Sequence, residues 1–445
     1  MLWLGLLALI LLLLMLRQSL VLVLAVAAAY IHAFIARSSI EFLIQDFWFT
    51  VDREVLLSIP MFMLAGNIMS RGSIARRLID FMSSLTSAFP GGMGIACVLS
   101  CAAFAAINGS SIVTMMAIGS IMYPALLARG YGKSFALGAI ASAGTLGIII
   151  PPSIPLILYG IMTERDISKL FVAGIGPGLL LTFLFVVWAM IVNARLPIRP
   201  LRWQEIGNAL FSGAFAMALP FLMIGGIYSG WFSPTEAGAI SLAYALMIEF
   251  FVHGEKDAAP APSGAGLLMR ARHYLATREM NLRTLVAVIL ETTKLLATLL
   301  PLLCVAGSLN TILDHSGAPR EMVQSVAGAI ENRWLMMVAI NGLLLVVGCL
   351  MDVGSAILIL APLLEPLAVA KGFDPIHFGI IMIANLEIGY LTPPVGLNLI
   401  VAMAAFKESF ATIVRAIVPF VVIMLIWLTI VVTYPPLSLY LIRGP

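Results

Sequence analysis

Apolar residues run along the chain in segments long enough to cross a lipid bilayer. A spanning helix needs about 20 consecutive, mostly apolar residues. Ten segments approach or exceed that length, and we predict them to be full crossings: 1–16, 19–36, 55–70, 134–163, 169–193, 209–228, 234–252, 286–312, 375–405 and 410–440. The pattern therefore predicts an all-α polytopic membrane protein.

Two further apolar stretches, 92–127 and 334–369, carry polar residues in their middle. The interruptions are "INGSS" at 107–111 and "MDVGS" at 351–355, so each arm is short for a full crossing. Two short crossing helices are one interpretation. We favour re-entrant hairpins, because a turn exposed to lipid would leave its backbone groups without partners.

Adjacent prolines interrupt two of the predicted crossings. "TLGIIIPPSIPLIL" covers 145–158, and "IGYLTPPVGLNL" covers 388–399. Proline inside a helix removes a hydrogen bond and clashes with the preceding turn, at a cost of about 3 kcal/mol or more. A single proline would suggest only a kink, but the same Gly-x3-Pro-Pro pattern in both halves indicates two functional breaks.

The two halves of the chain resemble each other at an offset of 242 residues. Pro124 corresponds to Pro366, Gly147 to Gly389, and the first proline pair to the second. The chain makes five predicted crossings between the start of the first copy and the start of the second. Because five is odd, the second copy enters the bilayer from the opposite side. Inverted repeats with paired broken helices are typical of secondary transporters, whose sites lie at the repeat interface.

Broken helices suit ion binding because freed carbonyls and half-helix ends can coordinate Na⁺, while helix N-termini favour anions. Glycines beside the breaks let another backbone approach closely. The hairpin tips add hard oxygen ligands, although Asp352 could equally cap the second arm. Our candidate sodium or substrate residues are Asn108, Gly109, Ser110, Ser111, Thr114, Gly147, Pro151, Pro152 and Ser153 in the first half, and Asp352, Gly354, Ser355, Glu387, Gly389, Thr392, Pro393, Pro394, Gly396 and Asn398 in the second.

The distribution of basic residues orients the chain. Of the 25 Lys and Arg residues, sixteen fall on one predicted side, eight on the other, and Lys294 lies inside a helix. The positive-inside rule makes the first side cytoplasmic and places both termini outside. We divide the chain into first-half scaffold helices and an interfacial arm (1–91), the first hairpin and broken helix (92–163), scaffold helices (164–252), a cytoplasmic linker (253–285), second-half scaffold (286–333), the second hairpin and broken helix (334–405) and a C-terminal helix (406–445).

Composition excludes several other classes. The chain is 61% hydrophobic and 11% charged, with a net charge of +3 and scattered basic residues, so we expect contact with membrane lipid and none with nucleic acid. The four cysteines form no CxxC pair, and we interpret them as packing residues. No Ser-His-Asp or metal-ligand spacing stands out, so we expect a transporter, and neither an enzyme nor a cofactor-dependent protein.

A few residues carry minor expectations. The amphipathic stretch 71–90 is predicted to lie along the membrane interface. Glu236 in "SPTE" is predicted to complete a capping box. Lys294 is expected to pair with Glu291 or to extend to the cytoplasmic edge, and His377 to be interfacial.

Several runs, among them "SGWFSPTEAGAISLAYAL" and "ANLEIGYLTPPVGLNLIVA", resemble the large membrane subunit (M or DctM type) of a TRAP (tripartite ATP-independent periplasmic) transporter. The resemblance covers nearly the whole chain. It implies a Na⁺-coupled importer of organic acids in a bacterial inner membrane, with an elevator-type motion of hairpins and broken helices. Asn108 is a departure, because the family usually has Ser there.

The resemblance also implies two protein partners, a small four-helix membrane subunit (Q or DctQ type) and a periplasmic substrate-binding protein (P type). Na⁺ would be the coupling ion, with no other cofactor. The alternatives are a stand-alone carrier or channel for organic anions, and an H⁺-coupled version that would use Asp352 or Glu387.

Overall fold

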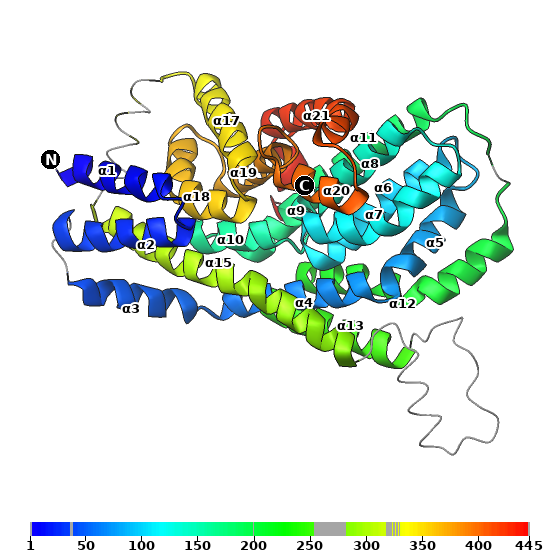
Figure 1. Ribbon diagram of the computed structural model, residues 1–445, viewed down its shortest axis with the longest axis horizontal. Coiled ribbons are helices and arrows are strands. Elements are labelled where there is room, and N and C mark those ends of the chain that lie inside the picture. The colour runs from blue at the N-terminus through cyan, green and yellow to red at the C-terminus, as the bar shows by residue number, and fades with distance from the viewer. Residues whose placement is uncertain are drawn as a thin grey trace, which may run out of the picture.

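The computed structural model describes residues 2–35, 39–198, 200–252, 282–316, 323, 325, 328 and 330–443. These residues form helices joined by short turns, with no strand among them (Figure 1). Seven of the described helices are long and apolar enough to cross a membrane, or up to nine if each bent pair counts as one span. The prediction of an all-α polytopic membrane protein is confirmed.

The first half contains the following elements: α1 (Leu2–Met15), α2 (Leu20–Tyr30), the π-helix η1 (Ile31–Ile35), α3 (Ile40–Val51), the 3₁₀-helix η2 (Glu54–Leu57), α4 (Ser58–Arg71), α5 (Ile74–Thr86), α6 (Gly92–Asn108), α7 (Ser111–Ala128), α8 (Lys133–Gly144), α9 (Leu146–Ile149), α10 (Ile154–Thr163) and α11 (Ile167–Val192). The second half contains α12 (Trp203–Tyr228), α13 (Pro234–Met247), the π-helix η3 (Ile248–Val252), α15 (Leu282–Ser316), α17 (Arg333–Leu350), α18 (Val353–Ala370), α19 (Pro375–Gly389), α20 (Leu397–Phe406), α21 (Phe410–Thr433) and α22 (Pro436–Arg443).

Both predicted breaks are present, and each predicted hairpin is a pair of helices, although three of the four arms (α7, α17 and α18) are long and apolar enough to cross a membrane. The helix pairs α6–α7 and α17–α18 each pack against each other and turn at their polar tip. The first broken helix consists of α8, α9 and α10, and the second consists of α19 and α20. Their path through a bilayer, and the inversion of one copy relative to the other, stay predictions.

The two halves are interlocked through the long helices that follow each break. The helix α11 follows the first broken helix and packs against α19, while α21 follows the second and packs against α8. The Trp427 indole of α21 also donates to the Pro177 carbonyl of α11 at 2.9 Å. Each break is therefore held by elements of both halves.

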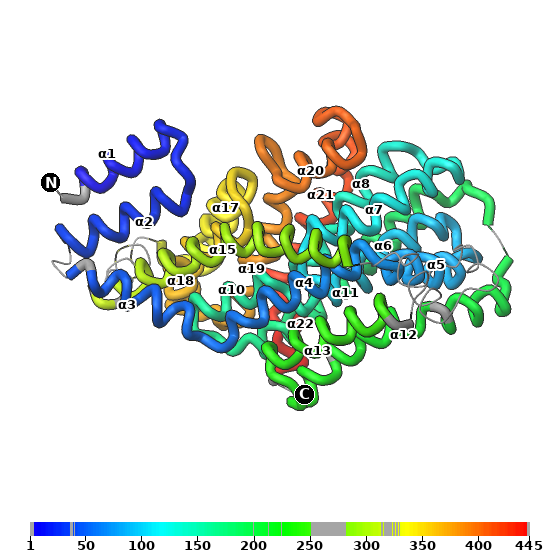
Figure 2. Tube along the Cα trace, turned by 60° about the horizontal axis from the view of Figure 1, so that its bottom comes forward, coloured from blue at the N-terminus to red at the C-terminus, as the bar shows by residue number. Residues whose placement is uncertain are grey.

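The core of the molecule lies at the first broken helix and not in the outer helices. The most apolar part of the segment Lys133–Thr163 is entirely buried, whereas that of α15 is one-third buried. The helices α1, α2 and α3 lie side by side at one end, and α15 passes along α2, α3 and α4 (Figures 1 and 2). Of these segments, the first broken helix is therefore the one enclosed on all sides, while the hairpin arm α17 is one-third buried, like α15.

A buried carboxylate fixes the bend of 68° between the helix that ends at Arg71 and α5. Glu249 of η3 accepts hydrogen bonds from the backbone N–H groups of Ser73 at 3.0 Å and Ile74 at 3.1 Å, at the start of α5. A carboxylate suits this place because a helix N-terminus has free N–H groups and a partial positive charge. The predicted amphipathic segment 71–90 is thus a helix, and its position at the membrane interface stays a prediction.

Several boundaries differ from the prediction. The helix α3 lies in a segment expected to be a loop, because Glu41, Gln45 and Asp46 interrupt its hydropathy. The segment 410–440 is not one helix but ends at Thr433, before a proline pair, and resumes as α22. α12 begins at Trp203, ahead of the predicted start, and α15 begins inside the predicted linker 253–285, of which residues 253–281 lie outside the described residues.

Candidate functional site: two hairpin tips on two broken helices

The tip of the first hairpin is organised by its own hydrogen bonds. Gly109 takes a left-handed conformation with φ of 63°, which ends α6 and turns the chain. The Asn108 Oδ1 atom accepts from the Ser110 N–H at 2.7 Å, and the Thr114 hydroxyl donates to the Ser110 carbonyl at 2.8 Å. The Asn108 side-chain amide also donates to the Thr114 hydroxyl at 2.9 Å. Asn108 therefore shapes the tip from inside.

This tip sits directly on the first break, with no space for side chains between them. A Cβ atom at Gly147 would lie 2.7 Å from the Ser110 carbonyl oxygen, and one at Gly109 would lie 2.5 Å from the Pro152 carbonyl oxygen. The Ile154 N–H of α10 points to the Gly109 carbonyl at 3.5 Å, and the Ser153 hydroxyl donates to the Ile148 carbonyl. Glycine at both places is what permits the close approach.

The second half repeats this construction. A Cβ atom at Gly389 would lie 2.6 Å from the backbone of Gly348, near the end of the first arm of the hairpin. The Gly396 N–H donates to the Cys349 carbonyl at 3.1 Å, and the Thr392 hydroxyl donates to the Ile388 carbonyl at 2.8 Å. Each hairpin is therefore tied by its backbone to the break of its own half.

Asp352 caps the second arm of the second hairpin. Its Oδ2 atom accepts from the Ser355 N–H at 2.8 Å, and its Oδ1 atom accepts from the Ser355 hydroxyl. Of the two alternatives for this residue, the structure confirms the cap. Gly354 lies beside the Asp352 carboxylate, where a Cβ atom would be 3.1 Å from Oδ2.

A side-chain contact joins the two half-sites. The Asn398 amide of α20 donates to the Ser111 hydroxyl of the first hairpin, although the two residues are 287 positions apart. The Oδ1 atom of Asn398 is buried and has no hydrogen-bond partner among the described residues. The contact brings two candidates from opposite halves together and leaves an amide oxygen available.

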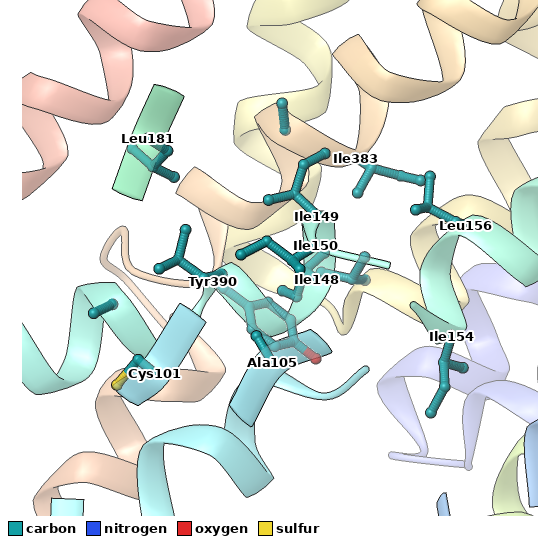
Figure 3. Close-up of a cluster of buried hydrophobic side chains, with 14 of the residues drawn as sticks. Cys101, Ala105, Ile148, Ile149, Ile150, Ile154, Leu156, Leu181, Ile383 and Tyr390 are labelled. Carbon is teal, nitrogen blue, oxygen red and sulfur yellow. The ribbon is translucent and has the colours of Figure 1, made fainter. Parts of the chain in front are cut away.

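The two breaks differ in exposure. Pro151, Pro152 and Ser153 are buried, whereas Asp352, Pro393 and the neighbouring proline of the second half are exposed. Figure 3 shows apolar side chains gathered about the first break, including Ile149 and Ile150 of the break itself, Ala105 and Cys101 of α6, Leu181 of α11, and Ile383 and Tyr390 from the second half. The first half-site is therefore sealed by apolar packing.

Glu387 of α19 is fully buried, and neither of its carboxylate oxygens has a hydrogen-bond partner among the described residues. The polar group beside it is the hydroxyl of Thr145, at the junction of α8 and α9. Glu387 thus lies in the interior, apart from the exposed residues of the second break.

The expectations for the remaining residues have mixed outcomes. Ser233 and Glu236 form the predicted capping box, and the four cysteines are free, three of them buried. His377 is buried in the first turn of α19, and its position at the membrane interface stays a prediction. Glu291 pairs with Arg71 at 2.6 Å instead of with Lys294, which is exposed.

Sequence reasoning missed one prominent ion pair. Glu365 of α18 is buried, and its carboxylate accepts a hydrogen bond from the guanidinium Nε of Arg165 at 2.9 Å. Arg165 lies in the turn between α10 and α11. A carboxylate inside the apolar run "ILAPLLEPLAVA" was the available signal, because an ionisable residue in such a segment usually has a specific role.

The described residues hold no group of three or more His, Cys, Asp or Glu side chains that could bind a metal ion. The polar groups gathered at the half-sites are hydroxyls, amides and backbone carbonyls, with the Asp352 carboxylate at the exposed tip. Oxygen atoms of these kinds are the ligands that hard cations take. A polytopic membrane protein with two such half-sites belongs to the class of membrane transport proteins.

Comparison with known proteins identifies the family. The sequence model of the family "Tripartite ATP-independent periplasmic transporter, DctM component" matches residues 6–437 of this chain. The C4-dicarboxylate TRAP transporter large permease protein DctM of Pseudomonas aeruginosa is 38% identical over 395 residues, which cover 88% of this chain and 87% of that protein. The chain belongs to the DctM family of TRAP transporter large permease subunits, so the expectation of a transporter and not an enzyme is confirmed.

Two further similarities bear on architecture. The isethionate TRAP transporter permease protein DctMQ of Oleidesulfovibrio alaskensis is 32% identical over 405 residues, covering 90% of this chain and 60% of that protein. The crystal structure of the YdaH transporter of Alcanivorax borkumensis matches with a TM-score of 0.55 at 14% identity, covering 91% of this chain and 89% of that one. The second likeness is one of fold alone.

Proposed function

We propose that this chain is the permease subunit through which a Na⁺-coupled TRAP system of a bacterial inner membrane imports a small organic acid. The observation that carries the proposal is the pair of hairpin tips seated on glycines of two broken helices and joined through Asn398 and Ser111. Such a site offers carbonyl, hydroxyl and amide oxygens to a cation, and helix N-termini to an anion.

The candidate ligands are the residues predicted from the sequence, without Asn108 and without Glu387, which is buried apart from the exposed residues of the second break. Both ends of the Asn108 side-chain amide are already hydrogen-bonded within the first hairpin tip. Ser110, Ser111, Thr114 and Ser153 would provide oxygen in the first half-site, and Asp352, Thr392 and Asn398 in the second. Gly147 and Gly389 supply the close backbone approach.

The substrate class comes from the relatives. The proteins from Pseudomonas aeruginosa and Oleidesulfovibrio alaskensis are named for C4-dicarboxylates and for isethionate, and each of these compounds is a small organic acid. We extend that class to this chain, with delivery by a periplasmic binding protein.

A small membrane subunit is the second proposed partner. The relative named DctMQ extends well beyond the part matched here. The name DctMQ combines the letters M and Q, which denote the large and the small subunit. This supports a small membrane subunit as a partner of this chain too. In this scheme both termini face the periplasm.

An elevator motion fits the division between core and surround. The first broken helix is enclosed by hairpins and by long helices of both halves. A unit packed in this way can move as one body past the outer helices, because close-packed interiors shift between discrete arrangements and do not deform continuously.

The test is uptake of labelled organic acids into proteoliposomes that hold this chain and its small partner. Uptake is expected to require both an inward Na⁺ gradient and the binding protein. Asn398→Leu should raise the Na⁺ concentration needed for half-maximal uptake by more than about tenfold, because it removes a buried amide oxygen. The matched control is Ser241→Ala in α13, which removes a buried hydroxyl that has no hydrogen-bond partner in the described part of the chain and should leave uptake unchanged.

Uptake driven by a proton gradient without Na⁺ would overturn the ion assignment. Uptake indifferent to the binding protein would instead reassign the chain to a stand-alone carrier.

A further inference from the structure

A large apolar cavity lies at the end of the molecule formed by α1, α2 and α3 (Figures 1 and 2). Its volume is about 780 Å³, within the range of about 300–1,000 Å³ that is usual for ligand pockets. Apolar side chains of α1, α2, α15 and α18 form most of its wall, among them Leu6, Leu24, Leu309 and Leu358. Protein interiors hold few voids larger than a water molecule, so a cavity of this size indicates an occupant.

Polar side chains at this cavity already have partners in the protein. The Ser308 hydroxyl of α15 donates to the Oδ2 atom of Asp46 in α3 at 2.8 Å, and its oxygen lies 3.0 Å from Nε2 of His32 in η1. Asn310 and Thr311 of α15 donate to backbone carbonyls. A buried water needs several polar partners, so this cavity suits an apolar chain better than a cluster of waters.

A second, more polar hollow of about 430 Å³ adjoins the first, because the two share five lining residues: Phe42, Asp46, Asn310, Thr311 and His315. Its wall also holds Arg53, which follows α3, and Glu164, which follows α10. These two side chains are 45% and 76% exposed, and the Arg53 Nη2 atom lies 3.6 Å from the Glu164 Oε1 atom. The two hollows together make one amphipathic site, apolar at one end and charged at the other.

Lipid is the amphiphile that surrounds a polytopic membrane protein. Arg53 lies in the turn between α3 and η2, and Glu164 lies in the turn between α10 and α11. Lipid-exposed turns do not occur within the hydrocarbon region, so exposed turns of this kind belong at the level of the lipid headgroups. An acyl chain in the apolar cavity would therefore place its headgroup beside Arg53 and Glu164.

The charges at the polar end suit a headgroup that carries both signs. A guanidinium has five N–H donors and binds phosphate oxygens in bidentate fashion. Arg53 gives one of these donors to the Ile161 carbonyl at 3.0 Å, and its half-exposed side chain can offer others to a phosphate. The Glu164 carboxylate can accept from a protonated primary amine, whereas a quaternary amine has no N–H to donate. A purely anionic headgroup would meet Glu164 as a like charge.

We propose that this site binds one phospholipid whose zwitterionic headgroup carries a primary amine. An acyl chain fills the cavity, the phosphate binds Arg53, and the amine binds Glu164. Because α18 is an arm of the second hairpin, the lipid lies between that hairpin and the helices α1 and α2. The inference concerns lipid binding and does not rest on the proposed function.

The first experiment is native mass spectrometry of the full chain in a mild detergent. The protein is titrated with phosphatidylethanolamine, phosphatidylcholine or phosphatidylglycerol, all with the same acyl chains. The wild type should retain one phosphatidylethanolamine with a Kd at least about tenfold lower than for the other two lipids, because only that headgroup can bond to both Arg53 and Glu164. Equal affinity for the three lipids, or no retained lipid, would overturn the proposal.

Variants test the two ends of the site separately. Ala306→Phe fills the cavity from α15 and should abolish retention, whereas the matched control Ala297→Phe, on the exposed face of the same helix, should not. Arg53→Ala should weaken binding by about tenfold, whereas Arg415→Ala, at an exposed position of α21, should leave it unchanged. Since Arg53 is half-exposed, its variant decides the question even if Ala306→Phe fails to fold. Unchanged retention in Arg53→Ala would overturn the assignment of the headgroup.

The second experiment locates the lipid with a phosphatidylethanolamine that carries a photoreactive diazirine on one acyl chain. After irradiation, adducts should concentrate on the peptides of α2, α15 and α18 that line the cavity. Adducts spread evenly over the outer helices would show surrounding lipid alone and would contradict the proposal. The measurement is repeated with the small membrane subunit bound. Release of the lipid on binding would assign the cavity to that subunit instead.

Discussion

The first and second half-sites are built from the same parts and differ in burial. In each, the hairpin packs directly against a glycine, Gly147 or Gly389. A backbone N–H that follows the proline pair donates a hydrogen bond to a carbonyl of the hairpin. Ser153 of the first break is fully buried, whereas its counterpart at the same offset, Val395, is 36% exposed. The same construction is thus buried in one half and partly exposed in the other.

The comparison teaches that sequence similarity between halves fixes the local geometry, while packing by neighbouring helices determines access. The backbone contacts at the two glycines are alike because each needs only a small residue and a tight turn. The apolar side chains around Ile149 and Ile150 come from α6, α11 and the second half (Figure 3). They cover the first proline pair, whereas Pro393, Pro394 and Val395 of the second break are exposed.

The largest effects are expected at the shared glycines. Gly147→Ala and Gly389→Ala each place a methyl group within 2.7 Å of backbone atoms, and backbone cannot move aside as a side chain can. Each variant should lose about 1–3 kcal/mol of stability and more than about 100-fold of uptake, measured by thermal unfolding in detergent and by proteoliposome transport.

The matched control for these variants is Gly342→Ala in α17, where a Cβ atom meets nothing within 4 Å. Normal uptake in Gly147→Ala would mean that the hairpin does not bear on the break.

The Arg165–Glu365 ion pair should give the next largest effect. Arg165→Ala leaves the Glu365 carboxylate, 8% exposed, without its partner. We expect a loss of about 2 kcal/mol, which is below the range for fully buried pairs because the Arg165 side chain is 39% exposed. Thermal unfolding measures it, and the charge-exchanged double variant should recover part of the loss. Unchanged stability in Arg165→Ala would contradict the assignment.

Asp352 separates a capping role from an ion-binding role at the open half-site. Asp352→Ala should cost about 1 kcal/mol, whereas Asp352→Asn should cost only a few tenths, because asparagine is also a good N-cap residue. If Asp352→Asn also weakens the Na⁺ dependence of uptake by more than about tenfold, the charge serves the ion as well as the helix. Equal stability of both variants would exclude the cap.

The smallest effect concerns the contacts of Glu408, which lies between α20 and α21. Tyr123 donates to Glu408 at 3.0 Å, and Lys133 pairs with Glu408 at 2.7 Å. The Lys133 ammonium lowers the pKa of the Glu408 carboxyl. A lowered folded-state pKa stabilises the protein above the usual glutamate range, and that stabilisation is lost as the pH falls through it.

Glu408→Gln should therefore unfold at a slightly lower temperature than the wild type at neutral pH, and the difference should vanish in acid. A difference that grows as the pH falls would contradict the sign of the shift.

The sequence predicted those features that depend on neighbouring residues. The Gly-x3-Pro-Pro pattern located both breaks, at Ile150–Ser153 and Tyr390–Gly396, because proline and glycine act on the backbone locally. The polar tips located both hairpins for a similar reason. The helix α3 was missed because three polar side chains within one helical segment lower its mean hydropathy.

Contacts between distant segments could not be predicted. The Asn398–Ser111 hydrogen bond joins two halves, and nothing in either local pattern selects the other residue. The closure of the first half-site depends in the same way on side chains from at least four elements. Local pattern thus indicated the candidate residues of the half-sites, and tertiary packing determined which of them are buried.

The most direct test of the central claim, two like half-sites of which one is open, is thiol labelling at the equivalent positions 395 and 153. Cys304 is replaced by serine, because the other three cysteines are already buried. Val395→Cys should react rapidly with a membrane-impermeant maleimide while Ser153→Cys stays protected, and any condition that exposes Ser153→Cys should do so from the opposite face of the membrane. Equal labelling of both positions from the same face would contradict the account.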